Sequence, residues 1–193
     1  MSVESREPGR TQRADGLRNR ERLIGAAKAG FAETGPEVSL EEIARRAGVG
    51  IGTLYRHFPT REAIVEAVYR REVRQLADGA TRLLGSLSPG EALHEWMRLF
   101  LDYVATKRLI GPALGSMVGG ASALYAASGE TITGAVAMLV GRAIANGDIR
   151  ADVDPMDVLR ALVGLSYGAA EPGWEASARR LIDVLMDGLR ARA

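Results

Sequence analysis

The 193-residue sequence contains no cysteine and only two histidines, His57 and His94. Disulfide bonds and catalysis by a thiolate are therefore excluded, and a reducing compartment is expected. We find no glycine-rich phosphate loop, no nucleophile paired with a base, and no cluster of metal-ligand spacing. The sequence therefore predicts a protein that is not an enzyme and that needs no cofactor and no metal.

Long apolar runs are also absent. Gly, Arg or Glu interrupts each apolar stretch before it is long enough to span a membrane, and the first 16 residues are polar. Hydrophobic residues make up 47% of the chain and charged residues 25%, which is typical of a soluble globular protein. The net charge of +1 is uninformative by itself, although the basic excess lies in the N-terminal part. We therefore expect a soluble cytoplasmic protein without a membrane partner.

Apolar residues recur at helical spacing through nearly the whole chain, and we find no strand pattern. The clearest period is Leu93, Trp96, Met97, Phe100, Leu101 and Val104. Gly, Pro and Asn-Gly sites divide the chain into about nine helices. The expected helices are about 16–34, 39–46, a short helix ending near 58, 60–84, one around 93–104, 108–118, 121–146, one from 155 and one after 173. The sequence predicts an all-α fold.

The segment from Ser39 to Phe58 has the pattern of two short helices joined by a tight turn. Ser39 and Glu42 are spaced as a capping box, Ala44 allows close helix crossing, and Gly48 permits the turn. Val49, Ile51 and Leu54 are expected to close the core between the helices. The residues left exposed on the second helix suit base edges and phosphates. A packed hairpin with ordinary surface residues is the alternative, but the ordered combination favours a helix-turn-helix that binds double-stranded DNA.

This segment resembles the TetR family of transcriptional regulators. Ala47-Gly48-Val49 followed by Gly52-Thr53-Leu54-Tyr55-Arg56-His57-Phe58 is similar to the family's core signature. Leu23-Ile24 with Ala26-Ala27, Phe31 with Glu33 and Gly35, and Arg61-Glu62-Ala63-Ile64 are similar to its first and fourth helices. The resemblance covers about residues 16–70. It implies a flexible arm at 1–15, a three-helix DNA-binding domain at 16–62, and a larger helical ligand-binding and dimerisation domain at 63–193.

The resemblance also implies which residues contact operator DNA. Gly52 and Thr53 are expected against bases, and Ser39, Tyr55, His57 and Arg61 at phosphates. Arg45 and Arg56 are further candidates, and Gly50 replaces the Ser or Thr common in the family. The arm could either touch phosphate or be a solvated tail. The complete predicted DNA-binding set is Ser39, Arg45, Gly50, Gly52, Thr53, Tyr55, Arg56, His57 and Arg61.

A small-molecule pocket in the C-terminal part is a further implication of the resemblance. Aromatic and methionine side chains suit an adaptable apolar pocket, although for any single one of them plain core is the more common role. The predicted pocket residues are His94, Trp96, Met97, Phe100, Tyr103, Met117, Tyr125, Met138 and Tyr167. The identity of the effector is left open.

The last two helices are the candidates for a homodimer interface. Each of them carries an apolar stripe, and these could either pair across a two-fold axis or be buried within one chain. The stripe residues are Leu159, Leu162, Val163, Tyr167, Leu181, Leu185 and Leu189. A symmetric dimer would place two recognition helices on two half-sites of a palindrome, and the resemblance favours it.

Three functions remain to be compared at this point. The leading expectation is a sequence-specific repressor that a small-molecule ligand releases from its operator. A ligand-independent regulator or an activator of the same fold is the alternative. A non-specific architectural DNA binder is expected to be more basic than +1.

Overall fold

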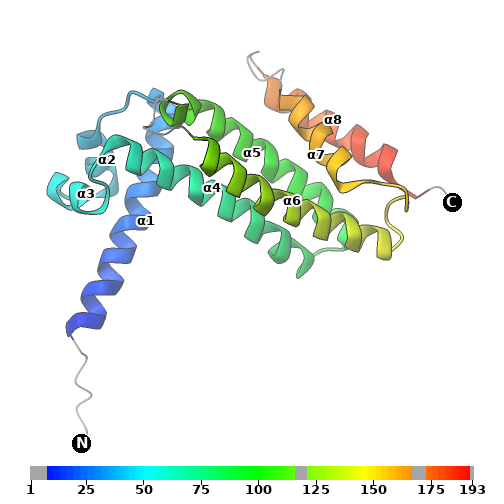
Figure 1. Cartoon of the computed structure of the whole chain (residues 1–193), viewed down its shortest axis with the longest axis horizontal. Coiled ribbons are helices and arrows are strands. Elements are labelled where there is room, and N and C mark those ends of the chain that lie inside the picture. The colour runs from blue at the N-terminus through cyan, green and yellow to red at the C-terminus, as the bar shows by residue number, and fades with distance from the viewer. Residues whose placement is uncertain (1–7, 116–120, 167–172, 192–193) are drawn as a thin grey trace, which may run out of the picture. The chain divides into compact units, whose positions relative to one another are not determined.

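The computed structural model describes residues 8–115, 121–166 and 173–191, and in these ranges the regular structure is helical apart from one isolated bridge between Ile149 and Arg190. The eight helices of the described residues are shown in Figure 1. They are α1 (Pro8–Thr34), α2 (Leu40–Ala47), α3 (Ile51–His57), α4 (Arg61–Leu84), α5 (Pro89–Gly115), α6 (Ser122–Ala145), α7 (Pro155–Leu165) and α8 (Trp174–Leu189). The all-α prediction is confirmed.

Two helices differ from the sequence expectation. α1 begins at Pro8 rather than near residue 16, so part of the expected arm is helical. The expected separate helix at 108–118 is wrong, because α5 continues through Gly111 and Pro112 to Gly115. Proline removes a helical N–H donor, but Ile110 and Leu114 on either side of it are fully buried. Their burial explains why the helix persists there. Because α5 is continuous, the described residues form eight helices where about nine were expected.

The chain packs as two compact units, which are described separately. The first contains residues 1–69 and 109–118, and the second contains residues 70–108 and 119–193. The sequence expectation instead placed a single boundary at residue 62. α4 and α5 therefore each contribute residues to both units.

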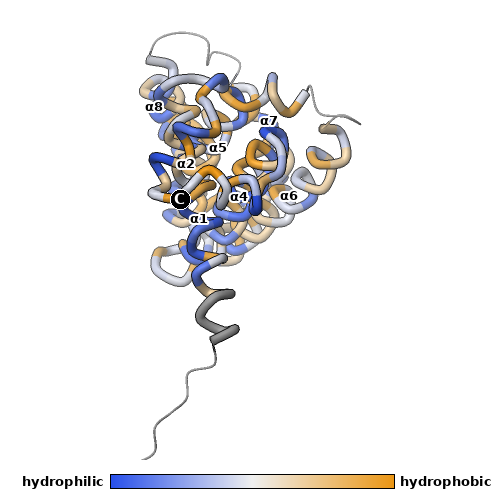
Figure 2. The backbone as a smooth tube through the Cα atoms, turned by 90° about the vertical axis from the view of Figure 1, so that its left-hand side faces the viewer, coloured by the Kyte–Doolittle hydropathy of each residue, from blue (hydrophilic) through white to orange (hydrophobic). Residues whose placement is uncertain are grey.

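The core of the first unit is built from the apolar faces of its short helices. Leu23, Ile24 and Phe31 of α1 are at most 1% exposed, and so are Ile43 of α2 and Leu54 of α3. Burial of each such side chain contributes roughly 1.5–3 kcal/mol. Figure 2 shows hydrophobic and hydrophilic residues interspersed along the helices, as expected where one face of each helix is buried. This packing is what holds the seven-residue α3 in place.

Side-chain caps fix the ends of several helices. At the start of α5, the Ser88 hydroxyl accepts a hydrogen bond from the Glu91 amide. The Glu91 carboxylate in turn accepts from the amide and the hydroxyl of Ser88, which completes a reciprocal capping box. Asp154 caps α7 by accepting a hydrogen bond from the Met156 amide at 2.7 Å, and Pro155 occupies the first turn, as the sequence predicted.

α6 is the one described helix whose length and apolar composition would also suit a membrane span. Its buried side, which includes Val136, Leu139 and Val140, packs inside the second unit. A core helix passes the same test of length and composition, so α6 is weak evidence for a membrane.

Candidate nucleic-acid interface

The turn between α2 and α3 is held by backbone hydrogen bonds. Gly48 adopts the left-handed conformation, with φ +64°, and its amide donates to the Arg45 carbonyl at 3.0 Å. The Val49 amide donates to the Ala44 carbonyl at 3.0 Å, which completes a Schellman motif. A Cβ at position 48 would lie 2.6 Å from the Arg22 guanidinium. The turn therefore favours glycine for its backbone angle, whereas the end of the flexible Arg22 side chain could shift to admit a Cβ.

α3 is a short helix that a single side chain of its own anchors. Leu54 is fully buried, and Phe58, which follows the helix, is 2% exposed. The prediction that Ile51 closes the core is wrong, because this side chain is 38% exposed at the first turn. Gly50 is the N-cap, and no side chain caps the helix. The rest of α3 is consequently available at the surface.

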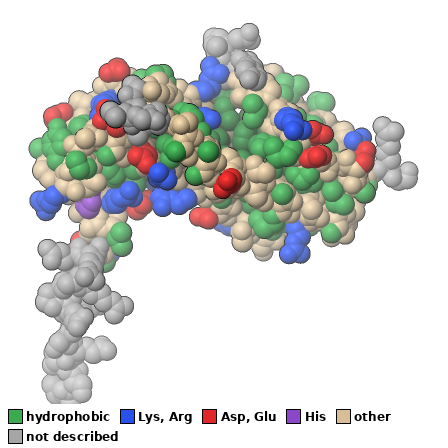
Figure 3. Space-filling model, in the orientation of Figure 1, with side chains coloured by type: hydrophobic (Ala, Val, Ile, Leu, Met, Phe, Trp, Pro, Cys, Tyr) green, Lys and Arg blue, Asp and Glu red, His purple; other side chains and the backbone are tan. Residues whose placement is uncertain are grey.

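The outer face of α3 carries the residues that the sequence singled out. Gly52, Tyr55 and Arg56 are exposed, and Thr53 and His57 are half-buried. A Cβ added at Gly52 would meet no atom within 4 Å. Basic side chains and a histidine lie close together on the visible face of this unit (Figure 3). Such a face offers hydroxyl, phenol and guanidinium groups to a nucleic-acid groove.

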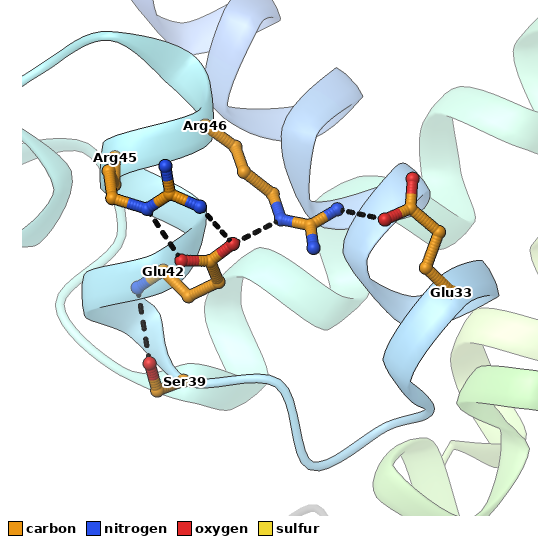
Figure 4. Close-up of polar contacts among 5 residues, drawn as sticks. All are labelled: Glu33, Ser39, Glu42, Arg45 and Arg46. Carbon is orange, nitrogen blue, oxygen red and sulfur yellow. Dashed lines mark hydrogen bonds and ion pairs between the residues drawn. The ribbon is translucent and has the colours of Figure 1, made fainter.

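The expected capping box at the start of α2 forms only in part. The Ser39 hydroxyl accepts a hydrogen bond from the Glu42 amide at 3.1 Å. The Glu42 carboxylate does not complete the reciprocal half, because it binds two guanidinium groups instead. It accepts from Arg45 Nε at 2.8 Å and Nη2 at 2.7 Å, and from Arg46 Nε at 2.6 Å. Arg46 also donates to Glu33 of α1 at 2.6 Å (Figure 4). We call Glu33, Glu42, Arg45 and Arg46 the Glu42 cluster.

Charge-assisted hydrogen bonds shift the ionisation of the Glu42 cluster. Those from Arg45 and Arg46 lower the pKa of Glu42 from 4.5 to about 2, and Glu42 in turn raises the pKa of Arg45. A carboxylate whose pKa is lower in the folded state stabilises the fold above the unfolded pKa. This contribution is therefore present above about pH 4.5 and is lost as the pH falls toward 2. Glu42 is therefore ionised at neutral pH.

Arg61 has an intramolecular role that the sequence did not indicate. Its guanidinium donates to the Val38 carbonyl at 2.7 Å and to the Pro36 carbonyl. These bonds connect the first turn of α4 to the loop between α1 and α2. The structure therefore places the Arg61 side chain on the backbone of the loop between α1 and α2, and the predicted phosphate contact stays a prediction.

α1 also contacts α2 and the residue that follows α3 through side chains whose roles sequence reasoning missed. The Arg20 guanidinium lies over the Phe58 ring, 5.2 Å from its centroid. Glu33 holds Arg46 across 13 positions of sequence. Helical spacing relates only residues within about one turn, so no local signal could have found these pairs.

Four of the predicted pocket residues lie together in the core of the second unit. Trp96, Met97, Phe100 and Tyr103 are at most 6% exposed. The Phe100 ring lies 5.9 Å from the Trp96 ring and 5.7 Å from the Tyr103 ring. The Trp96 indole N–H donates to the Leu76 carbonyl at 2.8 Å. This arrangement is a packed aromatic core, and the pocket role of these residues stays a prediction.

The other predicted pocket residues do not join that core. His94 Nε2 lies 2.8 Å from Asp183 Oδ1. The His94 side chain also lines a surface cleft of about 490 Å³ between the start of α5 and the end of α8. Met138 is 38% exposed, and Tyr125 is half-buried with the Lys107 amine 4.6 Å from its ring centroid. Met117 and Tyr167 lie outside the described residues. Among the side chains that the structure describes, no group of three or more suits a metal ion.

The predicted dimer stripes are divided between core and surface. Leu162 and Leu189 are buried, and Leu159 and Leu185 are half-buried. Val163 is 42% exposed and Leu181 is 45% exposed. Val184, which the sequence reasoning did not select, is 66% exposed on α8. Tyr167 again lies outside the described residues.

Two family models match the chain, one in each part. "Bacterial regulatory proteins, tetR family" matches residues 23–68, which contain α2, the turn and α3. "Transcriptional regulator SbtR-like, C-terminal domain" matches residues 88–191.

Known proteins show the same similarity. The structure of a TetR transcriptional regulator from Streptomyces coelicolor is 44% identical, with a TM-score of 0.83 over 90% of this chain and 99% of that one. A TetR regulator from Mycobacterium vanbaalenii is 36% identical, with a TM-score of 0.78 over 93% and 99%.

Curated relatives match less of the sequence. An HTH-type transcriptional regulator from Staphylococcus aureus is 32% identical over 48% of this chain and 49% of its own length. The chain thus spans about half the length of the first curated relatives that it matches. The regulator UidR of Escherichia coli is 29% identical over 77% of this chain and 78% of its own. With a helix-turn-helix of this geometry and these matches, the chain belongs to the TetR family of transcriptional regulators.

Proposed function

We propose that this protein is a cytoplasmic repressor that binds an operator as a homodimer and is released by a small-molecule ligand. The observation that carries the proposal is the outer face of α3, where Gly52 and Tyr55 are exposed on a helix that Leu54 fixes to the core. This face matches what a major groove requires, namely a helix with few bulky side chains and several hydrogen-bonding ones.

The binding site on α3 is tested by two alanine variants. Thr53→Ala and Tyr55→Ala are each expected to weaken operator binding about 10-fold, because each removes a contact with base or phosphate. Both side chains are outside the core, so helicity is expected to be unchanged. Genomic footprinting would supply the operator, and fluorescence anisotropy would then give affinities at several salt concentrations. Wild-type affinity for both variants would refute the site.

Ligand release is supported by the connectivity of the chain. α4 and α5 each contribute residues to both compact units, so a change in either helix is covalently continuous with the DNA-binding unit. A ligand can shift the balance between a DNA-binding state and a released state only by the difference in its affinity for the two states. A ligand-independent regulator or an activator is the second candidate. Cell extracts can be added that contain the metabolites handled by the products of the neighbouring genes. Operator affinity that these extracts leave unchanged would favour that candidate.

The homodimer proposal rests on the apolar side chains that α7 and α8 leave exposed, Val163, Leu181 and Val184. Val184→Glu is expected to convert a dimer into a monomer at micromolar concentration, because it places a charge in an apolar interface. Val184 is 66% exposed, so the fold of the monomer should be unaffected. Sedimentation velocity measures the change, with Ala176→Glu at an exposed position of the same helix as the control. Dimers of unchanged affinity in Val184→Glu would place the interface elsewhere.

A further inference from the structure

We propose that Glu42 holds Arg45 away from the DNA backbone and so suppresses sequence-independent binding. The inference rests on the proposed DNA-binding function. It assigns to Glu42 a role beyond helix capping, and it concerns the helix that precedes the recognition helix.

The geometry of the Glu42 cluster ties both arginines to carboxylates. One carboxylate receives three hydrogen bonds from two guanidinium groups, all between 2.6 and 2.8 Å. Arg45 is held by two of its nitrogens, the paired arrangement that makes an arginine–carboxylate contact directional. Arg46 is held at both ends, by Glu42 and by Glu33. Figure 4 shows both guanidinium groups directed toward carboxylates.

The charges within the Glu42 cluster cancel one another. The cluster contains two carboxylates and two guanidinium groups, so its formal charge sums to zero. The lowered pKa of Glu42 keeps its carboxylate ionised throughout the neutral range. Without this carboxylate, Arg45 in the last turn of α2 would lose its ion-pair partner, and Arg46 would keep only Glu33. Two potential phosphate ligands are thus neutralised within the protein.

The exposure of each side chain in the Glu42 cluster decides how easily its ion pair can be broken. The Arg45 side chain is 74% exposed, whereas those of Arg46 and Glu42 are 26% and 28% exposed. An exposed ion pair is weak and can be exchanged for another anion. Arg45 is therefore the arginine that a phosphate could capture once Glu42 is neutralised, and Arg46 stays tied to α1.

Sequence-independent binding and operator binding depend on different contacts with DNA. Sequence-independent binding comes almost entirely from cations at phosphates, whereas operator binding also uses base contacts from α3. Neutralised arginines on α2 lower the first kind and leave the base contacts unchanged. Glu42 therefore lowers the background affinity of the protein for DNA of any sequence.

The experiment compares Glu42→Gln with Glu41→Gln, which makes the same charge change at an exposed position in the same turn. Binding to a duplex of scrambled sequence is measured against salt concentration. Glu42→Gln is expected to tighten this binding about five-fold at low salt and to steepen the slope of log affinity against log salt by about 0.9, the value for one added phosphate contact. Glu41→Gln should leave the slope unchanged. Equal slopes in the two variants would overturn the proposal.

A double variant identifies the cation. Arg45→Gln should weaken scrambled-duplex binding more in the Glu42→Gln background than in the wild type, because only there is the arginine released. Equal losses in the two backgrounds would also overturn the proposal. The Ser39 cap bonds the backbone amide of residue 42 and survives the substitution, and circular dichroism verifies this. A wild-type protein without salt-dependent DNA binding would instead refute the proposed function, and the two failures are therefore distinguishable.

Discussion

Gly52→Leu is expected to lower operator affinity on the order of 100-fold, the equivalent of one or two good base contacts. Gly52 lies on the exposed face of α3, where a helix meets bases in the proposed complex. The free protein has room for the new side chain, because a Cβ at this position meets no atom within 4 Å. Leucine is also a better helix former than glycine, by roughly 0.8 kcal/mol. The variant should therefore be as stable as the wild type, or more stable, and still fail to bind.

The matched control is Gly141→Leu. Gly141 is an exposed glycine inside α6 that likewise has no atom within 4 Å of an added Cβ, and it lies in the other compact unit. It should gain the same helix propensity and keep its DNA affinity. Anisotropy titrations and thermal melts of the two variants separate binding from folding. Loss of binding in both, or in neither, would contradict the assignment of α3 as the reading helix.

Local chemistry explains why so much of the DNA-binding unit could be predicted. The left-handed Gly48 and the Ser39 cap both depend on residues within about one helical turn, and the helical period alone marks Leu54 as an inward position. Such features follow from backbone angles and side-chain period, which the sequence displays directly. The position of α3 and its exposed face were predictable for the same reason.

Contacts between distant residues explain what could not be predicted. Arg61 resembled a phosphate ligand by its place at a helix start, yet its guanidinium binds two carbonyls more than 20 positions earlier. Glu42 resembled half of a capping box, but two arginines on its own helix take its carboxylate. Only the packing of α4 against the α1–α2 loop selected the partners of Arg61. The arginines that compete for Glu42 lie three and four positions away, and they were chemically equivalent to the cap in the sequence.

The continuous α5 is a case of tertiary packing overriding a local signal. Gly111 and Pro112 together predict a helix end. Ile110 and Leu114 are nevertheless both fully buried, and their burial stabilises the helix across the break. Sequence alone shows the breakers but not the surface against which their neighbours pack.

Trp96 raises the same question in the second unit, because the sequence suggested a ligand contact and the structure shows a packed core. The side chain is fully buried, and its ring lies against Phe100. Its indole N–H is already used by the Leu76 carbonyl at 2.8 Å. A ligand that used this N–H would first have to break that bond.

Trp96→Ala is accordingly expected to lower the free energy of unfolding by about 3–5 kcal/mol, from lost burial and the cavity that remains. Trp96→Phe keeps most of the ring but removes the side-chain hydrogen bond to the Leu76 carbonyl, and a loss of about 2 kcal/mol is expected. Urea denaturation measures both. Trp174→Ala is the control, because this tryptophan is half-buried at the start of α8 and should matter less. If Trp96→Ala were as stable as the wild type, the ring would be dispensable for packing and the ligand role would become the better explanation.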